Sequence, residues 1–126
     1  MKRFFFLLAS LAAAGHATAG WSMLQETREG ILYIDRDGAA KTASGWTVDS
    51  SQDFHQIQLD QGKEYLSARA RYELDCAAKK IRRLRAEIYP ENMAGGGALD
   101  VNEQVQDWQI PEPGSRDGTI WKSLCQ

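Results

Sequence analysis

The sequence predicts a small α+β domain: an antiparallel β-sheet of about five or six strands with a short C-terminal helix packed on it. Three observations favour this fold class. Residues 66–76 alternate strictly between apolar and polar side chains, which is typical of a strand with one buried face. Short apolar segments bounded by turn residues fill much of the chain before them. Near the C-terminus, apolar residues recur at helical spacing instead.

The first 19 residues have the layout of a secretory signal peptide. A basic start at positions 2–3 precedes an apolar run over 4–14, and Ala17-Thr18-Ala19 supplies small residues in an A-x-A pattern. As a helix the run would span roughly 16 Å, whereas a bilayer core is about 30 Å thick. We therefore expect residues 1–19 to be a cleaved signal peptide and residues 20–126 to be a single exported domain.

The expected mature domain is mildly acidic. Removing the two basic residues of the signal from the chain's 15 leaves 13 against 17 acidic residues, a net charge of −4. A general nucleic-acid binder would carry an overall basic balance, so we expect no nucleic-acid partner. No second apolar stretch approaches membrane-spanning length. No cysteine lies near the cleavage site to carry a lipid, so we expect a free periplasmic or secreted protein with no membrane anchor.

The chain has two cysteines, Cys76 and Cys125, and both lie in the expected mature domain. In an oxidising compartment, such a pair is first interpreted as one disulfide. Closing a loop of that length would stabilise the fold by roughly 4 kcal/mol in the chain-entropy model. A redox or nucleophilic cysteine is the alternative, but the sequence holds no C-x-x-C motif. We therefore predict a structural disulfide.

Three strands are expected in the first half of the domain. Residues 21–26 form a plausible first strand, and the short apolar segment 31–35 predicts a second. The turn residues of segment 35–38 end it. A third strand is expected to start near Gly45 and to fade into the polar stretch 50–53.

Segments 66–76 and 82–89 predict a β-hairpin whose loop is residues 77–81. Opposite charges on the solvated face select its register, because like charges directly opposite each other cost stability. A shift of two residues would place Arg71 opposite Arg85, or one glutamate opposite another. The predicted pairs are Asp75 with Arg83, Glu73 with Arg85, and Arg71 with Glu87.

The C-terminal third is expected to be looser. Residues 98–101 predict a further short strand. Ser115 is placed to cap a helix, and Gly118 would weaken that helix by about 1 kcal/mol relative to alanine. The predicted apolar stripe of the helix is Ile120, Trp121, Leu124 and Cys125.

Basic residues gather in the middle of the chain, and they suggest a binding surface for an acidic partner. Arg71, Arg83 and Arg85 are expected to be neutralised by the carboxylates of the hairpin ladder. The remaining basic residues of the hairpin lack an obvious partner, and we expect Trp108 to be exposed. The candidate partner-binding residues are Lys79, Lys80 and Arg82.

Catalytic and metal sites are not expected. The only histidine of the mature domain is His55, which lies in a polar stretch with no nucleophile-elbow motif nearby. A zinc site would need three or four ligands. Asp35-x-Asp37-Gly38 matches part of a calcium loop, but a plain turn is the favoured interpretation. We therefore expect no cofactor, and an enzyme that uses His55 is the least favoured hypothesis.

A series of short segments recurs in an order that is more specific than any one of them. The segments are Gly20-Trp21, Tyr33-Ile34-Asp35, residues 62–67, residues 72–76, Tyr89, Trp108, residues 113–115, Trp121-Lys122 and Cys125. Taken in this order, they resemble the surface-adhesin protein E family of Gram-negative bacteria over about residues 21–125. The resemblance implies an antiparallel sheet with a packed helix and a non-enzymatic role, since the name-giving member binds host extracellular-matrix and serum proteins. That member is a lipoprotein, whereas this chain has no lipidation cysteine.

The leading functional hypothesis is an exported, non-catalytic protein-interaction module that resembles a bacterial surface adhesin. Its partner would be a host or envelope protein with an acidic surface. The alternative is a periplasmic structural or accessory protein that never meets the outside. Exposed sheet edges could also support a homodimer.

Overall fold

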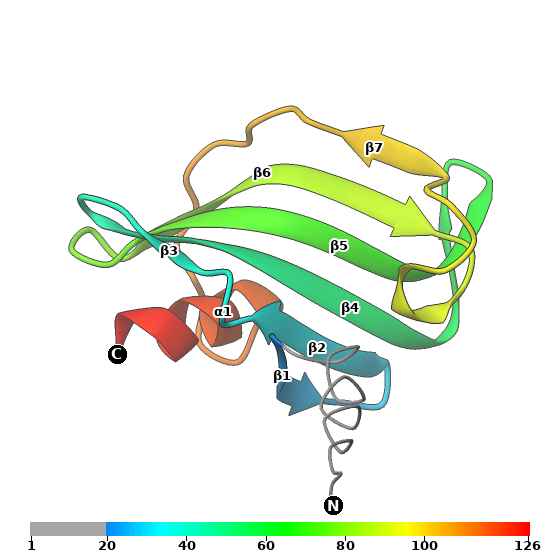
Figure 1. Ribbon diagram of the computed structural model, residues 1–126, viewed down its shortest axis with the longest axis horizontal. Coiled ribbons are helices and arrows are strands. Elements are labelled where there is room, and N and C mark those ends of the chain that lie inside the picture. The colour runs from blue at the N-terminus through cyan, green and yellow to red at the C-terminus, as the bar shows by residue number, and fades with distance from the viewer. Residues whose placement is uncertain (1–19) are drawn as a thin grey trace, which may run out of the picture.

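The computed structural model describes residues 20–126, so the predicted signal peptide lies outside the described residues. One antiparallel sheet curls around a single C-terminal helix (Figure 1). The sheet has seven strands, one more than the sequence predicted, in the order β1-β2-β4-β5-β6-β7, with β3 paired to β4. The elements are β1 (Trp21–Glu26), β2 (Gly30–Asp35), β3 (Ala40–Lys41), β4 (Gly45–Asp60), β5 (Lys63–Asp75), β6 (Lys80–Tyr89), the 3-10 turn η2 (Asn92–Ala94), β7 (Asp100–Asn102) and α1 (Arg116–Cys125).

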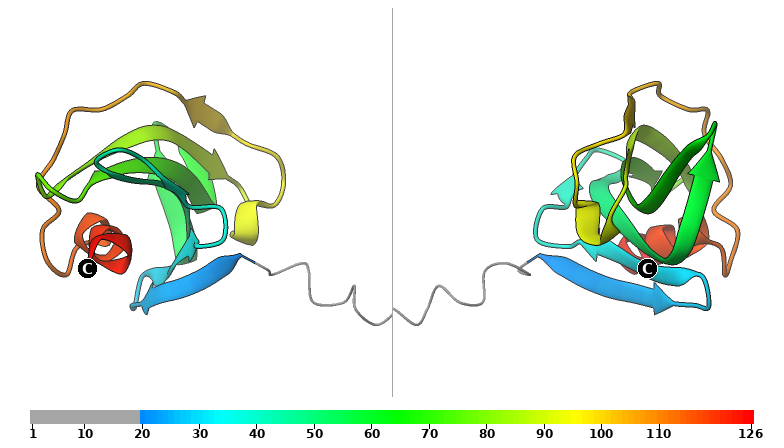
Figure 2. Two further views of the ribbon diagram at one scale, coloured as in Figure 1. Left: turned by 60° about the vertical axis from the view of Figure 1, so that its left-hand side comes forward. Right: turned by 90° about the vertical axis from the view of Figure 1, so that its right-hand side faces the viewer.

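The sheet is bent into an arch, and α1 lies beneath one end of it (Figure 2). Because side chains alternate along a strand, about every second residue of β2, β4, β5 and β6 lies on the inner face of the arch, and those at the covered end of the sheet face α1. Those residues form the core together with the buried side of the helix. The core residues are Leu32, Ile34, Val48, Tyr72, Leu74, Ile81, Ile120 and Trp121.

Strand β4 is much longer than predicted. It does not fade at residues 50–53 but continues to Asp60, so that expectation was wrong. The polar segment stays in the sheet because β4 is central and pairs with β2 on one side and β5 on the other. Ser50 and Ser51 are buried there, and the Ser50 hydroxyl donates to the carbonyl oxygen of Ala70 at 3.3 Å. Backbone pairing on both sides therefore holds this segment in the sheet despite its polar side chains.

The predicted register of the β5–β6 hairpin is wrong by two to three residues. Leu74 lies opposite Ile81 instead of Leu84, and Arg71 lies opposite Arg85, the like-charge pair that was expected to be avoided. The observed register buries Ile81 completely, which is worth roughly 1.5–3 kcal/mol. A cross-strand ion pair contributes only about 0.2–1 kcal/mol. Burial of this one apolar side chain therefore outweighs any single predicted ion pair and is comparable with all three pairs together.

A β-bulge on β6 accompanies this register. Tyr72 lies opposite Arg83 and Arg71 lies opposite Arg85, so Leu84 is the extra residue. Residues two apart on a regular strand share a face. The bulge separates Arg83 from Arg85, because Arg83 joins Tyr72 on the arched inner face while Arg85 joins Arg71 on the outer face.

The turn around η2 covers part of the outer face. The Ser67 hydroxyl donates to the carbonyl oxygen of Glu91 at 2.6 Å and accepts from the Ala94 amide at 2.9 Å. The Asp53 carboxylate accepts from the Met93 amide at 2.8 Å. Met93 and Ala94 have positive φ values of 54° and 60°, a conformation that L residues adopt at a cost. Hydrogen bonds from two strands hold this turn in place.

Helix α1 begins where the sequence predicted. The Ser115 hydroxyl accepts a hydrogen bond from the Gly118 amide at 3.0 Å, so Ser115 is the N-cap. Gly118 has a second role, because a Cβ there would lie only 1.8 Å from the carbonyl oxygen of Glu112. The predicted disulfide between Cys76 and Cys125 is confirmed, and it joins the end of α1 to the end of β5.

Candidate functional site: the hairpin tip, the outer face and the inner groove

The tip of the β5–β6 hairpin carries two exposed lysines. Lys79 lies in the turn with a φ of 56°, and Lys80 begins β6. The Asp75 carboxylate accepts a hydrogen bond from the Ala78 amide at 2.9 Å, which closes the turn. Within residues 20–126, neither lysine takes part in an ion pair. The tip therefore presents two lysine charges to solvent.

Arg82, the third predicted contact residue, is not free. Its guanidinium lies 2.8 Å from the Glu73 carboxylate and 4.4 Å from the ring centre of Trp108. The expectation that Arg82 lacks a partner was therefore wrong, and so was the expectation of an exposed Trp108, which is half-buried. Ile81 exchanges two backbone hydrogen bonds with Gln109, next to Trp108. Arg82 thus holds segment 108–109 against β6.

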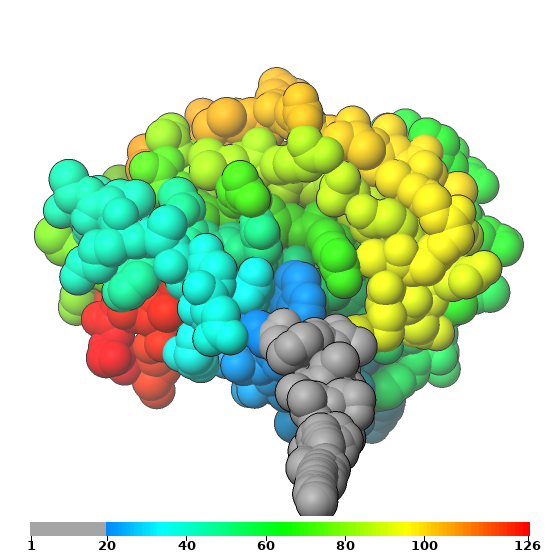
Figure 3. Space-filling view, viewed as in Figure 1, coloured from blue at the N-terminus to red at the C-terminus, as the bar shows by residue number. Residues whose placement is uncertain are grey.

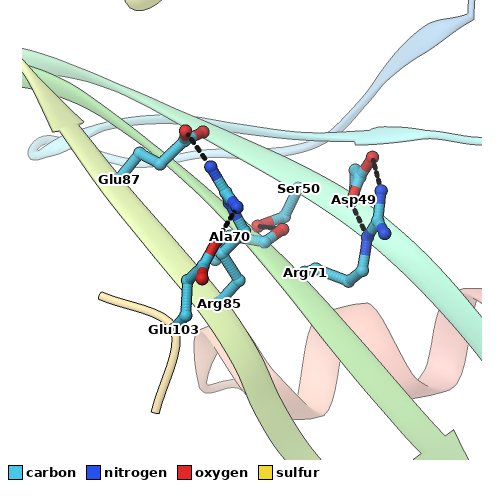
Figure 4. A network of polar contacts seen from close by, with 7 residues as sticks. All are labelled: Asp49, Ser50, Ala70, Arg71, Arg85, Glu87 and Glu103. Atoms are coloured by element: carbon cyan, nitrogen blue, oxygen red, sulfur yellow. Dashed lines mark hydrogen bonds and ion pairs between the residues drawn. The ribbon is translucent and has the colours of Figure 1, made fainter. Parts of the chain in front are cut away.

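The outer face of the sheet carries an ion-pair network in place of the predicted ladder (Figure 4). Arg71 makes two hydrogen bonds to Asp49 on β4, at 2.8 and 3.2 Å. Arg85 contacts Glu87 on its own strand at 2.8 Å, and also contacts Glu103. Each arginine of the like-charge pair therefore has its own carboxylate partner, which explains how the observed register tolerates them side by side.

These contacts shift the ionisation of the groups involved. The hydrogen bond to Asp49 raises the pKa of Arg71 above its usual value. The hydrogen bond from Arg85 lowers the pKa of Glu87, and a second bond from the Tyr89 hydroxyl at 3.1 Å acts in the same direction. The network is therefore charged at neutral pH.

The front surface is hollowed over the strands, between the cyan segment near β3 and the yellow segment near η2 (Figure 3). A recess of about 180 Å³ includes Trp21 and Arg69 among its lining residues. Three arginines line it, and the guanidinium of Arg69 lies 4.9 Å from the ring centre of Trp21, so this cation is stacked on an aromatic face while Arg71 and Arg85 are in ion pairs. With its cations paired or stacked, the outer face offers little free charge to a partner.

The inner face holds a larger groove of about 370 Å³, beyond the end of the sheet that α1 covers. Its floor is made of small side chains, Ala68 and Ala70 on β5 and Ala86 on β6. Phe54 and Tyr65 lie beside the floor, with their rings edge to face at 5.8 Å. The floor residues occupy inward positions of the strands, as the core residues do, but they are alanines. Their small side chains leave the space that forms the groove.

Two arginines stand at the covered end of the groove. Arg83 lies opposite Tyr72 on the sheet, and the Arg116 guanidinium lies 5.7 Å from the ring centre of Tyr72. Arg116 pairs with Asp117 at 2.9 Å, whereas Arg83 has no ion pair among residues 20–126. The Arg83 Nε is buried without a hydrogen-bond partner in the described part of the chain. Burial raises the pKa of Tyr72 to about 12, and the two arginine charges act against that rise.

His55 lies near the surface beside a carboxylate of β1. Its Nε2 lies 3.7 Å from the Glu26 carboxylate, and about half of its side chain is exposed. The described residues contain no group of three or more histidine, cysteine, aspartate or glutamate side chains that could hold a metal ion. In the calcium-like segment, the Asp35 carboxylate accepts from the Gly38 amide at 3.0 Å. That segment is therefore a turn, as the sequence predicted.

A family model described as surface-adhesin protein E matches residues 21–126. The chain belongs to the surface-adhesin protein E family. The resemblance drawn from the sequence is thereby confirmed, and the family is one of adhesins and not of enzymes. No match was found among curated proteins.

Solved structures of Haemophilus influenzae protein E share the fold of this family member. Crystal form II gives a TM-score of 0.66 at 15% identity and covers 85% of this chain and 87% of that chain. Another structure of the protein gives a TM-score of 0.63 at 16% identity and covers 85% of this chain and 84% of that chain. Protein E from a non-typeable strain gives a TM-score of 0.62 at 16% identity and covers 85% of this chain and 76% of that chain. At this identity the likeness concerns the fold.

The sequence found the two free lysines of the tip but missed the groove. Lys79 and Lys80 are adjacent in a turn between two strands, so local patterns identify them. Arg83 and Arg116 are far apart along the chain and meet only because α1 returns to the sheet beside Tyr72. The sequence did hold one indication that Arg83 lacks an ion-pair partner in the hairpin. If Ile81 is placed in the core opposite Leu74, Arg83 lies opposite Tyr72 and not opposite a carboxylate.

Proposed function

We propose that this member of the surface-adhesin protein E family is an exported, non-catalytic domain that binds another protein. The family supports this proposal most directly, because its model spans residues 21–126, almost all of the described chain. The described residues also lack a metal-binding cluster. None of their helices has the length and apolar character needed to cross a membrane.

The hairpin tip is the proposed contact surface for an acidic partner. Lys79 and Lys80 are exposed and free of ion pairs within residues 20–126, so their charges are available to carboxylates of another protein. Arg82 contributes indirectly, since its contacts with Glu73 and Trp108 brace the strand that carries the tip. The proposed partner is a host matrix or serum protein, and an envelope protein is the alternative.

Binding to a panel of purified host matrix and serum proteins tests the contact surface. Replacing both Lys79 and Lys80 by glutamate should weaken any specific binding at least tenfold at low salt, because like charges then face the acidic partner. A matched control is Lys122→Glu on α1, which removes one exposed lysine elsewhere and should change binding little. Equal binding by the tip variant and the parent protein would exclude the tip as the contact.

Protease treatment of intact bacterial cells tests the location. An adhesin at the surface is degraded on intact cells. Degradation only after the outer membrane is permeabilised would place the protein in the periplasm and favour a structural or accessory role there. A periplasmic control protein must survive treatment of the intact cells.

A further inference from the structure

The groove on the inner face has a chemistry that the proposed contact at the hairpin tip does not use. The paired strands place its residues in successive rows. Tyr72 lies opposite Arg83, Ala70 opposite Ala86, and Ala68 opposite Ile88. Strand β7 extends the last two rows, with Asn102 opposite Ala86 and Asp100 opposite Ile88. The groove therefore runs from the arginine end, past an alanine floor, to an acidic end.

The arginine end is suited to a carboxylate. Arg83 and Arg116 both line the groove, and both are neighbours of Tyr72, Arg83 as its cross-strand partner and Arg116 over its ring. Among residues 20–126 only Arg116 has an acidic partner, Asp117, so the two guanidinium groups together have positive charge in excess. A planar guanidinium binds a carboxylate through two parallel hydrogen bonds.

The opposite end is suited to an ammonium group. Asp60 and Asp100 both line the groove there. Among residues 20–126, the one ion-pair partner of Asp100 is Lys63, whose ammonium lies 3.9 Å away, and such exposed pairs are weak. An incoming ammonium would add to this pair without displacing a strong contact.

The groove is also lined by amide side chains, which suit peptide groups better than a hydrocarbon chain. Three amide side chains, Gln52, Gln58 and Asn102, line it. The Asn102 oxygen accepts from the Gln104 amide at 2.9 Å, the Gln52 oxygen accepts from Arg116 at 3.5 Å, and the Gln58 nitrogen donates to the Gln56 carbonyl at 3.0 Å. Each side-chain amide thus makes a hydrogen bond within the protein through either its oxygen or its nitrogen, and its other polar atom can bond to a ligand.

The length of the groove selects the size of the ligand. Tyr72 and Ala68 are four residues apart on β5, which corresponds to about 13 Å at the rise of a β-strand. An extended peptide of about four residues has the same length between its charged termini. A volume of about 370 Å³ lies within the usual range for small-ligand sites, roughly 300–1,000 Å³.

We propose that the inner groove binds a short peptide with free termini, its carboxylate between Arg83 and Arg116 and its ammonium at Asp60 and Asp100. The site is separate from the hairpin tip, because the core row of Leu74 and Ile81 lies between them. It would bind its ligand whether or not the tip contacts another protein.

The probe is tetraalanine with free termini, titrated into the isotopically labelled protein and followed by the backbone amide signals. Shifts should concentrate on Ala68, Ala70, Ala86 and Asn102. The C-terminal amide of the same peptide should bind about tenfold to a hundredfold more weakly, because a hydrogen-bonded charge pair is lost. This comparison uses the unaltered protein, so it does not depend on any variant folding.

Two variants locate the carboxylate. Arg83→Gln and Arg116→Gln should each weaken binding of free tetraalanine and should remove the difference between it and the amidated peptide. The control is Lys80→Gln at the hairpin tip, which should leave tetraalanine binding unchanged while it weakens binding of an acidic partner protein. Failure of the tip proposal and failure of the groove proposal are thus distinguishable.

Three results would overturn the groove proposal. One is equal binding of free and amidated tetraalanine. The second is shifts that concentrate on residues outside the groove. The third is the absence of any shift up to about 10 mM peptide, which exceeds the millimolar dissociation constant of even a weak specific site.

Discussion

The two halves of the inner face differ although the same strands build both. In the covered half, Val48, Leu74 and Ile81 meet α1 and leave almost no exposed surface. In the open half, Ala68, Ala70 and Ala86 occupy equivalent inward positions and no helix lies over them. The difference places the packed core in one half of the sheet and the proposed binding groove in the other. Tyr72, with Arg83 and Arg116, marks the boundary between them.

The largest expected effect comes from releasing the helix that covers the core. Replacing Cys76 and Cys125 together by serine should lower the free energy of unfolding by about 2–5 kcal/mol. The midpoint of urea unfolding measures this loss. A loss below about 1 kcal/mol, near the scatter of surface substitutions, would mean that the packing of α1 alone holds it in place.

Two isoleucines, one in the covered half and one in the open half of the inner face, allow the stability of the halves to be compared directly. Ile120→Ala on α1 should cost about 2–5 kcal/mol, because its side chain is fully buried and would leave a cavity. Ile88→Ala in the groove should cost clearly less, because Ile88 is only half-buried. Urea unfolding measures the loss in free energy of unfolding for each of the two variants. Equal losses would contradict the division into a covered and an open half.

The ionisation of Tyr72 tests whether this side chain is buried at the boundary between the two halves of the inner face. Because burial raises its folded pKa from 10 to about 12, the unfolded chain releases the phenol proton first as the pH rises. The stabilisation from the neutral phenol is therefore complete below about pH 10 and is lost between about pH 10 and 12, at up to about 1.4 kcal/mol per pH unit. Tyr72→Phe should remove this part of the pH dependence. Urea unfolding at pH 9–11 measures the free energy of unfolding of both proteins. If it changed equally with pH in the parent protein and in Tyr72→Phe, Tyr72 would be in contact with solvent.

The smallest effect is expected on the outer face. Arg71→Gln breaks the two hydrogen bonds to Asp49, but both side chains are partly exposed, so the loss should be only about 0–1 kcal/mol. The loss should shrink further in high salt, because screening weakens exposed ion pairs. A loss as large as that of Ile120→Ala would mean that the network, and not the core, stabilises the sheet.

Local patterns predicted the elements that depend on local chemistry. The alternation over residues 66–76 correctly predicted β5, and Ser115 correctly predicted the start of α1. The hairpin register was missed because it depends on which apolar residue enters the core: Ile81 was assigned to the loop, whereas it is fully buried. The length of β4 was missed because pairing with β2 and β5 sustains the polar segment 50–53, and pairing with β5 alone continues the strand to Asp60.

The candidate sites divide in the same way. Lys79 and Lys80 were found because the turn that exposes them is local. Arg82 was misjudged because Trp108, its stacking partner, returns from a distant segment. The groove was missed because placing Ile81 in the core turns Arg83 inward, and only the folded helix brings Arg116 to the ring of Tyr72.

The accessibility of methyl groups to a soluble paramagnetic probe tests the division of the inner face most directly. The methyl signals of Ala68, Ala70 and Ala86 should broaden strongly in the native protein, because the open half is in contact with solvent. Those of Leu74, Ile81 and Ile120 should be unaffected, because these side chains are fully buried. Equal protection of the alanine methyls would contradict the account, since the groove would then be closed in solution.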